Sequence, residues 1–516
     1  MKTQTHLDEP AVAAAQSPGA LAQRAGYPST FLDYQKLSDL SRCPAPSASR
    51  VGEILEKART LQGLTAEEAA ELAAIGDPEQ MRQLLATAGW VKEQIYGKRM
   101  VLFAPLYTGN YCVNNCVYCG FRVDNRDMRR VVLSMDEIAR QTEILLSQGH
   151  KRILIISGES PKQSLDYTLK AIETCYAVRV GTARVRRINV ELAPLDVEGF
   201  RALKKAGIGT YVCFQETYDP DLYRRAHPSG PKADYLYRLS VMDRAMEGGC
   251  DDIGLGALFG LGSWRYELVA LLEHARHLEE TFGWGPHTVS VPRIEYAPGA
   301  PWAEVVPNPV SDDDFRKIVA ILRIARPSVG IILSTRERTE FRKELLAYGV
   351  SQISAGSRTD PGGYEADGPQ DKSEAAPAAS ATTLAAAAAL GCPASKPGAA
   401  QHPAQFAIGD HRGLEETISD LIDDGYVPSF CTGCYRRGRT GADFMDLAKP
   451  GLIKEFCLPN GLVSFAEYLY DYASPATREK GLALIRRMQA EATPKGRVYL
   501  EKALAETEAG ARDLYL

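Results

Sequence analysis

The chain has 516 residues, of which 45% are hydrophobic, so it is long and apolar enough to form a substantial core and is not a disordered protein. Its net charge of −5 and pI near 6.0 lack the basic excess of nucleic-acid-binding proteins. No apolar run reaches the roughly 18 residues of a membrane-spanning helix, and the first residues match neither a secretory signal nor a transit peptide. We therefore expect a cytoplasmic protein that binds neither nucleic acid nor a membrane.

Residues 1–45 are predicted to be loosely ordered, and residues 46–98 to form a helical extension. Thr65 and Glu68 have the three-residue spacing of a helix-capping box, in which each side chain bonds to the backbone of the other residue. Pro78 stands where a second helix would begin, a position that tolerates proline because its missing N–H has no partner there anyway.

From residue 99 to about residue 358, short β-rich runs alternate with amphipathic helical stretches. Eight such runs occur, among them "RMVLFAPLY", "RILIIS" and "GIILST", and "SMDEIARQTEILLSQGH" is one of the helical stretches between them. Repeated β-then-α order is typical of parallel sheets, and eight repeats predict a (β/α)8 TIM-type barrel. The fold class is therefore α/β, with the barrel spanning 99–358.

The regular pattern then stops. Residues 366–404 are dominated by Ala, Pro, Ser and Gly, a composition that buries too little apolar surface to offset the entropy lost on ordering. We assign a flexible insertion to 359–405 and a mostly helical C-terminal domain to 406–516.

Three cysteines directly follow the first predicted strand, in "YTGNYCVNNCVYCGFR": Cys112, Cys116 and Cys119. In a reducing compartment, clustered cysteines indicate metal binding rather than disulfides. Three thiolates on a loop at the C-terminal end of a barrel can hold three irons of a 4Fe–4S cluster and leave the fourth iron open. The alternative is a structural zinc knuckle, which this spacing fits poorly because no fourth ligand is near.

This Cys-x3-Cys-x2-Cys pattern, with Tyr118 before its last cysteine, resembles the radical S-adenosylmethionine (SAM) superfamily. The resemblance implies that SAM chelates the open iron and is cleaved reductively to a 5′-deoxyadenosyl radical, with the protein orienting and shielding the chemistry. Tyr118 would contribute to the cofactor site.

Five further residues are candidates for the SAM site. Ser157, Gly158 and Glu159, at the end of the second strand, match the superfamily motif that bonds the SAM amino group, although an ordinary strand-to-helix turn is the alternative. Glu191 and Glu216 lie on later strands, where contacts to the cofactor and partners in a structural network explain a buried carboxylate equally well.

The stretches "QETYDPDLYRRAHPSGPKADYLYRL", "LSTRE" and "SAGSRTDPGGY" resemble the aromatic-amino-acid lyases of this superfamily, in which an Arg and a hydroxyl hold the substrate carboxylate. The matching residues here are Arg336 and Ser354. A planar guanidinium suits a carboxylate. The alternatives are a salt bridge from Arg336 to Glu337 or Glu340 and a structural hydroxyl at Ser354.

A second cysteine group follows in the C-terminal domain. Cys431, Cys434 and Cys457 have Cys-x2-Cys-x22-Cys spacing, again without a fourth cysteine. This pattern resembles the HydG family of FeFe-hydrogenase maturases, and the resemblance extends from about residue 50 to the C-terminus, interrupted by the insertion. It implies an auxiliary iron–sulfur cluster that carries an extra iron. The intervening Arg436, Arg437 and Arg439 are expected to form a solvated basic face, and the alternative is contact with cluster sulfides or an anionic product.

His287, in "GWGPHTVSVPRI", is expected where the sixth strand begins, at the barrel end opposite Cys112–Cys119. A lone histidine at a strand start is usually a surface or capping residue. The HydG resemblance instead implies that His287, with free cysteine as an external ligand, holds the extra iron. The barrel interior would then connect two clusters.

The HydG resemblance implies a tyrosine lyase. The enzyme would cleave L-tyrosine to p-cresol and dehydroglycine, then form CO and cyanide on the auxiliary cluster for the hydrogenase active site. Its partners would be a reductant such as ferredoxin or flavodoxin and the other hydrogenase maturases. Two alternatives are a tyrosine lyase that supplies dehydroglycine for thiamine thiazole synthesis and a non-catalytic iron–sulfur scaffold or electron carrier.

Overall fold

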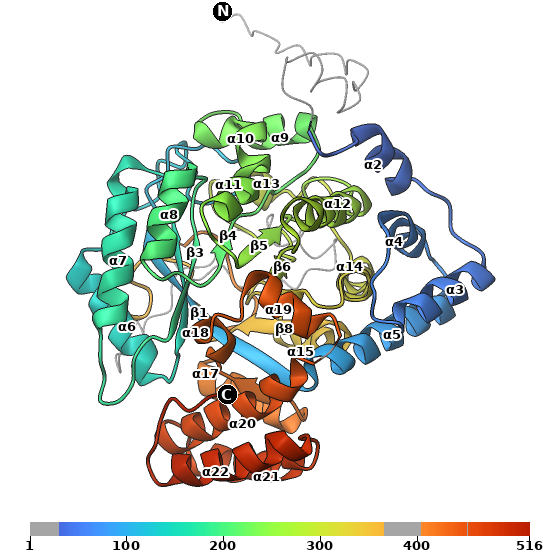
Figure 1. Cartoon of the computed structure of the whole chain (residues 1–516). Coiled ribbons are helices and arrows are strands. Elements are labelled where there is room, and N and C mark those ends of the chain that lie inside the picture. The colour runs from blue at the N-terminus through green and yellow to red at the C-terminus, as the bar shows by residue number, and fades with distance from the viewer. Residues whose placement is uncertain (1–29, 366–403, 451) are drawn as a thin grey trace, which may run out of the picture.

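The computed structural model describes residues 30–365, 404–450 and 452–516. Eight parallel strands close into a barrel in sequence order, since β1 pairs with both β8 and β2 (Figure 1). The predicted (β/α)8 barrel is therefore confirmed. Its strands are β1 (Arg99–Gly109), β2 (Arg152–Ser157), β3 (Arg187–Glu191), β4 (Tyr211–Val212), β5 (Ile253–Gly256), β6 (Thr288–Ser290), β7 (Gly330–Leu333) and β8 (Val350–Ser354).

Helices surround the barrel (Figure 1). Each packs its apolar face onto the strands, and Ser134 and Glu137 form a capping box at the start of the first. The surrounding helices are α6 (Met135–Ser147), α7 (Leu165–Ala177), α8 (Val197–Lys205), α11 (Val241–Glu247), α12 (Trp264–Phe282), α14 (Asp312–Ala325) and α15 (Thr339–Tyr348). Shorter elements in the connections are η1 (Pro161–Gln163), α9 (Pro220–Ala226), η2 (Pro231–Ala233), α10 (Tyr235–Leu239) and α13 (Pro301–Glu304).

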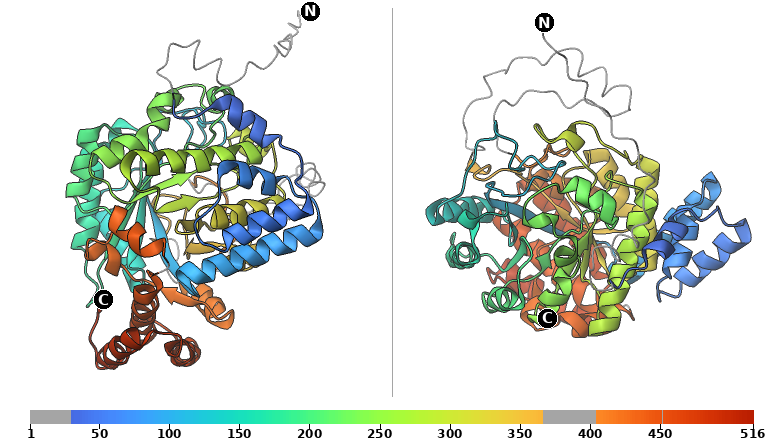
Figure 2. Two further views of the ribbon diagram at one scale, coloured as in Figure 1. Left: turned by 45° about the vertical axis from the view of Figure 1, so that its right-hand side comes forward. Right: turned by 90° about the horizontal axis from the view of Figure 1, so that it is seen from above.

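The N-terminal helices lie against one side of the barrel (Figure 2). They are α2 (Tyr34–Ser41), α3 (Ala48–Ala58), α4 (Ala66–Ala73) and α5 (Pro78–Tyr96). The capping box of Thr65 and Glu68 is present, and α5 begins at Pro78 as expected. Helix α2 lies within the segment for which loose order was predicted, and it is held by burial of Tyr34 and Leu37. Residues 1–29 lie outside the described part of the chain.

The C-terminal region adds a ninth strand that sequence analysis did not predict. Strand β9 pairs in parallel with β1, and Arg99 lies opposite Val427. A three-residue segment that contains Pro428 has almost no sequence pattern typical of a strand. The strand is therefore evident only in the folded protein, where it pairs with β1. The elements here are α17 (Leu414–Asp423), β9 (Val427–Ser429), α18 (Gly433–Arg436), α19 (Gly441–Ala448), α20 (Lys454–Asp471), α21 (Pro475–Gln489) and α22 (Pro494–Glu508).

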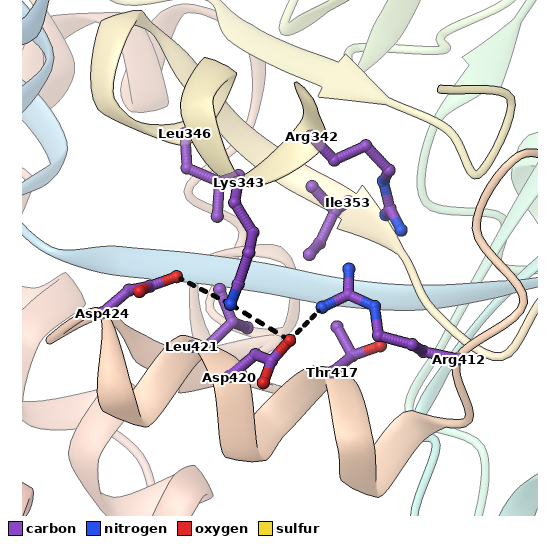
Figure 3. A pocket seen from close by; sticks show the side chains of 9 residues that line it. All are labelled: Arg342, Lys343, Leu346, Ile353, Arg412, Thr417, Asp420, Leu421 and Asp424. Atoms are coloured by element: carbon purple, nitrogen blue, oxygen red, sulfur yellow. Dashed lines mark hydrogen bonds and ion pairs between the residues drawn. The ribbon is translucent and has the colours of Figure 1, made fainter. Parts of the chain in front are cut away.

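Helices α20, α21 and α22 project from one end of the barrel (Figure 2). An ion-pair network fastens α17 to the barrel helix α15, beside a recess of only about 10 Å³ (Figure 3). In it, Lys343 lies 3.2 Å from Asp420 and 3.8 Å from Asp424, and Arg412 lies 2.5 Å from Asp420. Because its charged groups pair with one another, we interpret this recess as a structural joint rather than a binding site.

The Ala/Pro-rich insertion lies outside the described residues for 366–403, and the division of the chain at 45, 98, 358 and 405 remains a prediction. Within the described residues, none of the helices combines the length and apolar character required to cross a bilayer.

Candidate functional site

The first cysteine group lies on the loop that follows β1, at the C-terminal end of the barrel. Cys116 is 5% exposed, and Cys112 and Cys119 are half-buried. Burial raises the pKa of the Cys116 thiol to about 12; nearby Lys232 opposes the rise, while Cys119 and Cys112 add to it. Because the three thiols affect one another's pKa, they lie close together. Thiols that bind a metal cluster are deprotonated.

The end of β2 supports this cysteine loop directly. The N–H of Val113 donates to the carbonyl oxygen of Glu159 at 2.8 Å. A side chain at Gly158 would collide with the carbonyl oxygen of Tyr111, so only glycine allows the loop to lie this close. The Asn114 amide donates to the Glu159 carboxylate at 2.6 Å. The predicted motif Ser157–Glu159 is thus placed against the cysteine loop.

A charged network lies behind the cysteines. Lys232 lies 2.6 Å from Glu216, and the hydroxyl of Tyr118 lies 2.7 Å from His227 Nε2. Burial raises the pKa of Glu216, but Lys232 and Arg238 outweigh it, so the net pKa is lowered and the carboxylate stays charged.

Glu216 has a backbone φ of 70°, a conformation uncommon for a residue other than glycine and often found at functional sites. Lys232 was missed by sequence reasoning, because it lies in η2, a three-residue 3-10 helix too short to show periodicity.

A cavity of about 80 Å³ opens within the C-terminal end of the barrel and brings together Glu191, Arg336 and Ser354. Burial raises the pKa of Glu191 to about 7; Glu216 adds to the rise and Arg336 opposes it. Ser354, the last residue of β8, is 3% exposed. The three predicted polar residues therefore share one cavity.

Arg336 has no carboxylate partner among the residues described. The alternative of a salt bridge with Glu337 is wrong, because Glu337 pairs with Arg293 instead. The Arg336 guanidinium lies over the ring of Phe406, 3.4 Å from its centroid, and donates to the carbonyl oxygen of Arg293 at 3.4 Å. The carboxyl groups of Glu191 and Glu295 lie within its electrostatic reach, but neither forms an ion pair with it. A cation in a cavity that is stacked on an aromatic ring and forms no ion pair among the described residues is suited to an anionic ligand.

The segment after the insertion returns to this end of the barrel. The Gln405 amide accepts a hydrogen bond from Tyr107 at 2.8 Å and donates to Cys119 Sγ at 3.6 Å. The N–H of Gly120 donates to the Gln405 carbonyl oxygen at 3.1 Å. Sequence reasoning missed Gln405 and Phe406, because they stand at the boundary of the low-complexity segment.

The second cysteine group lies at the other end of the barrel. Pairing of β9 with the start of β1 carries Cys431 to the N-terminal end, whereas Cys112 follows the other end of the same strand. At about 3.3 Å per residue, β1 separates the two groups by roughly 30 Å. Cys434 and Cys457 pack with Phe444 and Trp284 in one apolar cluster. Burial raises the pKa of Cys434 to about 12, and Cys457 and Cys431 add to the rise.

His287 faces this second group. It directly precedes β6, and its imidazole centroid lies 4.2 Å from that of Phe444, which packs beside Cys434 and Cys457. Burial lowers the pKa of His287; Asp252 opposes that effect, and Arg187 adds to it. A neutral imidazole is the form that binds metals. Within the described part of the chain, its ring has no hydrogen-bond partner.

The expectation of a solvated basic face between these cysteines is wrong for two of the three arginines. Arg436 is bonded to Asp513 through two contacts of 2.6 Å, and Arg439 donates to the carbonyl oxygen of Leu516. Arg437 is exposed and lies over the ring of Tyr515. The last residues of the sequence fold over this loop, a long-range contact that local charge patterns do not reveal.

Among the described residues, no three of His, Cys, Asp and Glu converge as around a single metal ion. Each cysteine of a 4Fe–4S cluster binds a different iron, so its ligands stand further apart than those of one ion. Two groups of three thiols, without a fourth cysteine in either, suit clusters that keep one iron open better than closed zinc sites.

Known proteins match the chain along most of its length. The family model "Radical SAM superfamily" matches residues 106–274, and "Biotin and Thiamin Synthesis associated domain" matches residues 290–427. A crystal structure of HydG, a maturase of the [FeFe]-hydrogenase, is 43% identical, with a TM-score of 0.86 over 95% of this chain and all of that one. The chain belongs to the HydG family of the radical SAM superfamily.

Two further relatives are similar to the chain. The X-ray structure of the maturase HydG from Carboxydothermus hydrogenoformans is 38% identical, with a TM-score of 0.74 over 95% of this chain and all of that one. The 2-iminoacetate synthase of Salmonella typhimurium is 30% identical over 319 residues, which are 61% of this chain and 82% of that protein. The chain is thus a radical SAM hydrogenase maturase, of a superfamily that uses SAM and a 4Fe–4S cluster.

Proposed function

We propose that this maturase cleaves L-tyrosine to p-cresol and dehydroglycine and converts the two-carbon fragment to CO and cyanide on an auxiliary iron–sulfur cluster, for assembly of the hydrogenase active site. One observation supports this proposal most: two groups of three cysteines lie at opposite ends of one barrel, and a cavity with an unpaired arginine lies beside the first. A single-step lyase needs only the first group.

The residues at the C-terminal end fit SAM and its cluster. Cys112, Cys116 and Cys119 would hold three irons, and the edge Ser157–Glu159 against their loop offers carbonyl and carboxylate oxygens to the SAM amino group. Bound together, the cluster and SAM supply the one-electron cleavage that starts radical chemistry. Glu191 would contact the cofactor from the cavity wall, and Tyr118 and Glu216 would do so from the network beside the cysteines.

The tyrosine carboxylate would bind to Arg336 and Ser354, which line the same cavity. The Phe406 ring fixes the guanidinium plane, so its two-pronged edge can meet a carboxylate without reorganisation. The substrate amino group would then lie towards the SAM end of the cavity, where the hydrogen atom is removed.

We expect Arg336→Met to lower kcat/KM for p-cresol formation roughly 10- to 100-fold, because a hydrogen bond to a charged group contributes about 1.5–3 kcal/mol. The measurement is p-cresol release over a range of tyrosine concentrations. Arg338→Met is the matched control, since Arg338 is exposed and pairs with Asp312 outside the cavity. Equal kcat/KM for both variants would contradict the carboxylate role.

At the N-terminal end, Cys431, Cys434 and Cys457 would hold the auxiliary cluster. His287, together with free cysteine from solution, would hold the extra iron, which collects CO and cyanide. The neutral imidazole beside Phe444 suits that role.

For His287→Ala, we expect binding of the extra iron to weaken about tenfold or more, because even residues that only orient metal ligands contribute that much. Iron analysis and the high-spin electron paramagnetic resonance (EPR) signal report the loss. The control is His411→Ala, which removes an exposed histidine. An unchanged high-spin signal in the His287 variant would exclude the ligand role.

One reaction tests the whole proposal: anaerobic incubation with SAM, tyrosine and a reductant, assayed for p-cresol, CO, cyanide and deoxyadenosine. The similarity to a 2-iminoacetate synthase favours a second candidate, a lyase that only supplies dehydroglycine for thiazole synthesis. That enzyme would form p-cresol without CO. A non-catalytic scaffold would form no deoxyadenosine.

The remaining assignments follow from the same proposal. A ferredoxin or flavodoxin would supply electrons, and other hydrogenase maturases would receive the product. These partners act in the cytoplasm.

A further inference from the structure

Apolar side chains line much of the cavity that contains Arg336. Two of them are aromatic rings, of Phe103 on β1 and of Phe214 just after β4, and Leu154 and Ile332 are among the others. Ligand cavities commonly combine such apolar walls with a few polar groups that fix the orientation of the ligand. This part of the cavity is suited to an aromatic ring.

A missing side chain on β5 determines where the Phe214 ring lies. A Cβ atom at Gly256, the last residue of β5, would collide with this ring, so the ring occupies the place of the absent side chain. Gly256 pairs with Ser290 on the neighbouring strand β6. Paired residues of neighbouring strands point to the same side of a sheet, so the Phe214 ring lies beside Ser290.

Ser290 therefore places a hydroxyl group next to an aromatic ring. The residue is 7% exposed and lines the cavity. Its hydroxyl has no hydrogen-bond partner within the described part of the chain. A buried hydroxyl is costly unless it is bonded. The Ser290 hydroxyl is thus available to a polar group of a ligand that lies against Phe214.

Several other polar side chains of the cavity already have partners. The Tyr107 hydroxyl donates to the Gln405 amide at 2.8 Å, and the Thr359 hydroxyl donates to a backbone carbonyl oxygen at 3.0 Å. Ser334 accepts a hydrogen bond from a backbone N–H at 3.4 Å. These groups are engaged within the protein and do not need a ligand.

The remaining hydroxyls stand with the arginine. Thr335 directly precedes Arg336, Ser354 ends β8, and Ser357 follows three residues later, with a buried hydroxyl that lacks a partner. These residues belong to the end of the cavity that we assign to the substrate carboxylate. Ser290 differs from them because it comes from β6 and lies beside the Phe214 ring.

We propose that Ser290 recognises the phenol hydroxyl of the substrate, whose ring lies against Phe214. This inference rests on the proposed function, in which tyrosine binds in this cavity by its carboxylate. A serine hydroxyl can donate or accept, so it can bond to a phenol oxygen. A phenylalanine ring would leave the buried Ser290 hydroxyl unpaired, and the cavity would thereby select tyrosine over phenylalanine.

The test is a double-mutant cycle in which the hydroxyl is removed from the protein, from the ligand and from both. L-tyrosine and L-phenylalanine are titrated calorimetrically into the full-length, cluster-reconstituted protein with SAM and without a reductant. Wild type should bind tyrosine more tightly. Ser290→Ala should lower this preference about fivefold or more, because tyrosine binding weakens and phenylalanine binding does not. An unchanged preference would overturn the proposal.

Two further variants distinguish recognition of the phenol from other effects. Ser351→Ala also removes a buried, unpaired hydroxyl, but Ser351 stands on β8 and does not line the cavity, so this variant should keep the wild-type preference. Arg336→Met should weaken both amino acids alike. If either variant lowered the preference as much as Ser290→Ala, the proposal would be refuted.

The pattern of binding by the Ser290 variant is equally decisive. Equal weakening of tyrosine and phenylalanine would show that Ser290 contacts a group that the two amino acids share, and it would refute recognition of the phenol. If Ser290→Ala does not fold, Ser290→Gly removes the same hydroxyl and should lower the preference as well. A wild-type preference in Ser290→Gly would contradict the proposal.

The p-cresol assay separates this inference from the proposed function. Wild type that prefers tyrosine through Ser290 but releases no p-cresol after reduction would contradict tyrosine cleavage and leave the binding site in place. Wild type that releases p-cresol but binds tyrosine and phenylalanine equally would overturn the role of Ser290 and leave the proposed reaction in place.

Discussion

Replacement of both Cys431 and Cys434 by alanine is expected to abolish CO and cyanide formation while p-cresol formation continues. The two ends of β1 separate the cysteine groups, so the first cluster and the tyrosine cavity should survive loss of the second. One remaining thiol, Cys457, cannot hold an iron–sulfur cluster that needs three. The measurement is gas-phase CO, cyanide and p-cresol from one anaerobic reaction.

Cys175→Ala is the control for the loss of a thiol. Cys175 is buried on α7, remote from both cysteine groups in the sequence, and bonded to Thr142. This variant should keep all three products. Full CO output from the double variant would show that the second cysteine group is not the site of CO formation.

The second large effect is expected from Cys116→Ala, which should lower SAM cleavage below detection. Cys116 is the most buried of its group, so no solvent ligand can easily replace its thiolate. Deoxyadenosine, p-cresol, CO and cyanide should therefore disappear together. Chromatography of deoxyadenosine and p-cresol measures the loss.

The iron content of the Cys116 variant distinguishes loss of the SAM cluster from unfolding of the protein. The Cys116 variant should retain the iron of the auxiliary cluster, because Cys431, Cys434 and Cys457 lie at the other end of the barrel. A variant that still releases p-cresol would contradict the assignment of Cys116 to the SAM cluster.

Tyrosine cleavage and capture of its fragment would take place at opposite barrel ends, where the charged residues pair differently. At the C-terminal end, the Glu216 carboxylate is matched by Lys232, and Arg336 is the cation left open. At the N-terminal end, Arg187 pairs with Asp252, whereas Arg152 forms no ion pair among the described residues. Positive charge at both ends suits an anionic fragment that is released at one and received at the other.

The local features of the fold were predictable because short-range rules control them. The eight strands, the capping box of Thr65 and Glu68, and the start of α5 at Pro78 follow from β-rich runs, three-residue spacing and the missing N–H of proline. The first cysteine group is likewise local, since three thiols within eight residues must lie on one loop, whereas Cys457 of the second group lies on α20 and meets Cys431 and Cys434 only through folding. His287 was placed at the start of β6 for the same reason.

Sequence by itself therefore determined the barrel, the two cysteine patterns, and the positions of Cys112–Cys119 and His287 at opposite barrel ends. Only the tertiary structure decided which charges remain unpaired. Among the described residues, Glu337 pairs with Arg293 and leaves Arg336 without a carboxylate partner, and Asp252 pairs with Arg187 and leaves Arg152 without one. Pairing of β9 with β1 brings Cys431 to Arg152, although 279 residues separate them. Ion pairs depend on which side chains meet after long-range packing, and no local pattern encodes that choice.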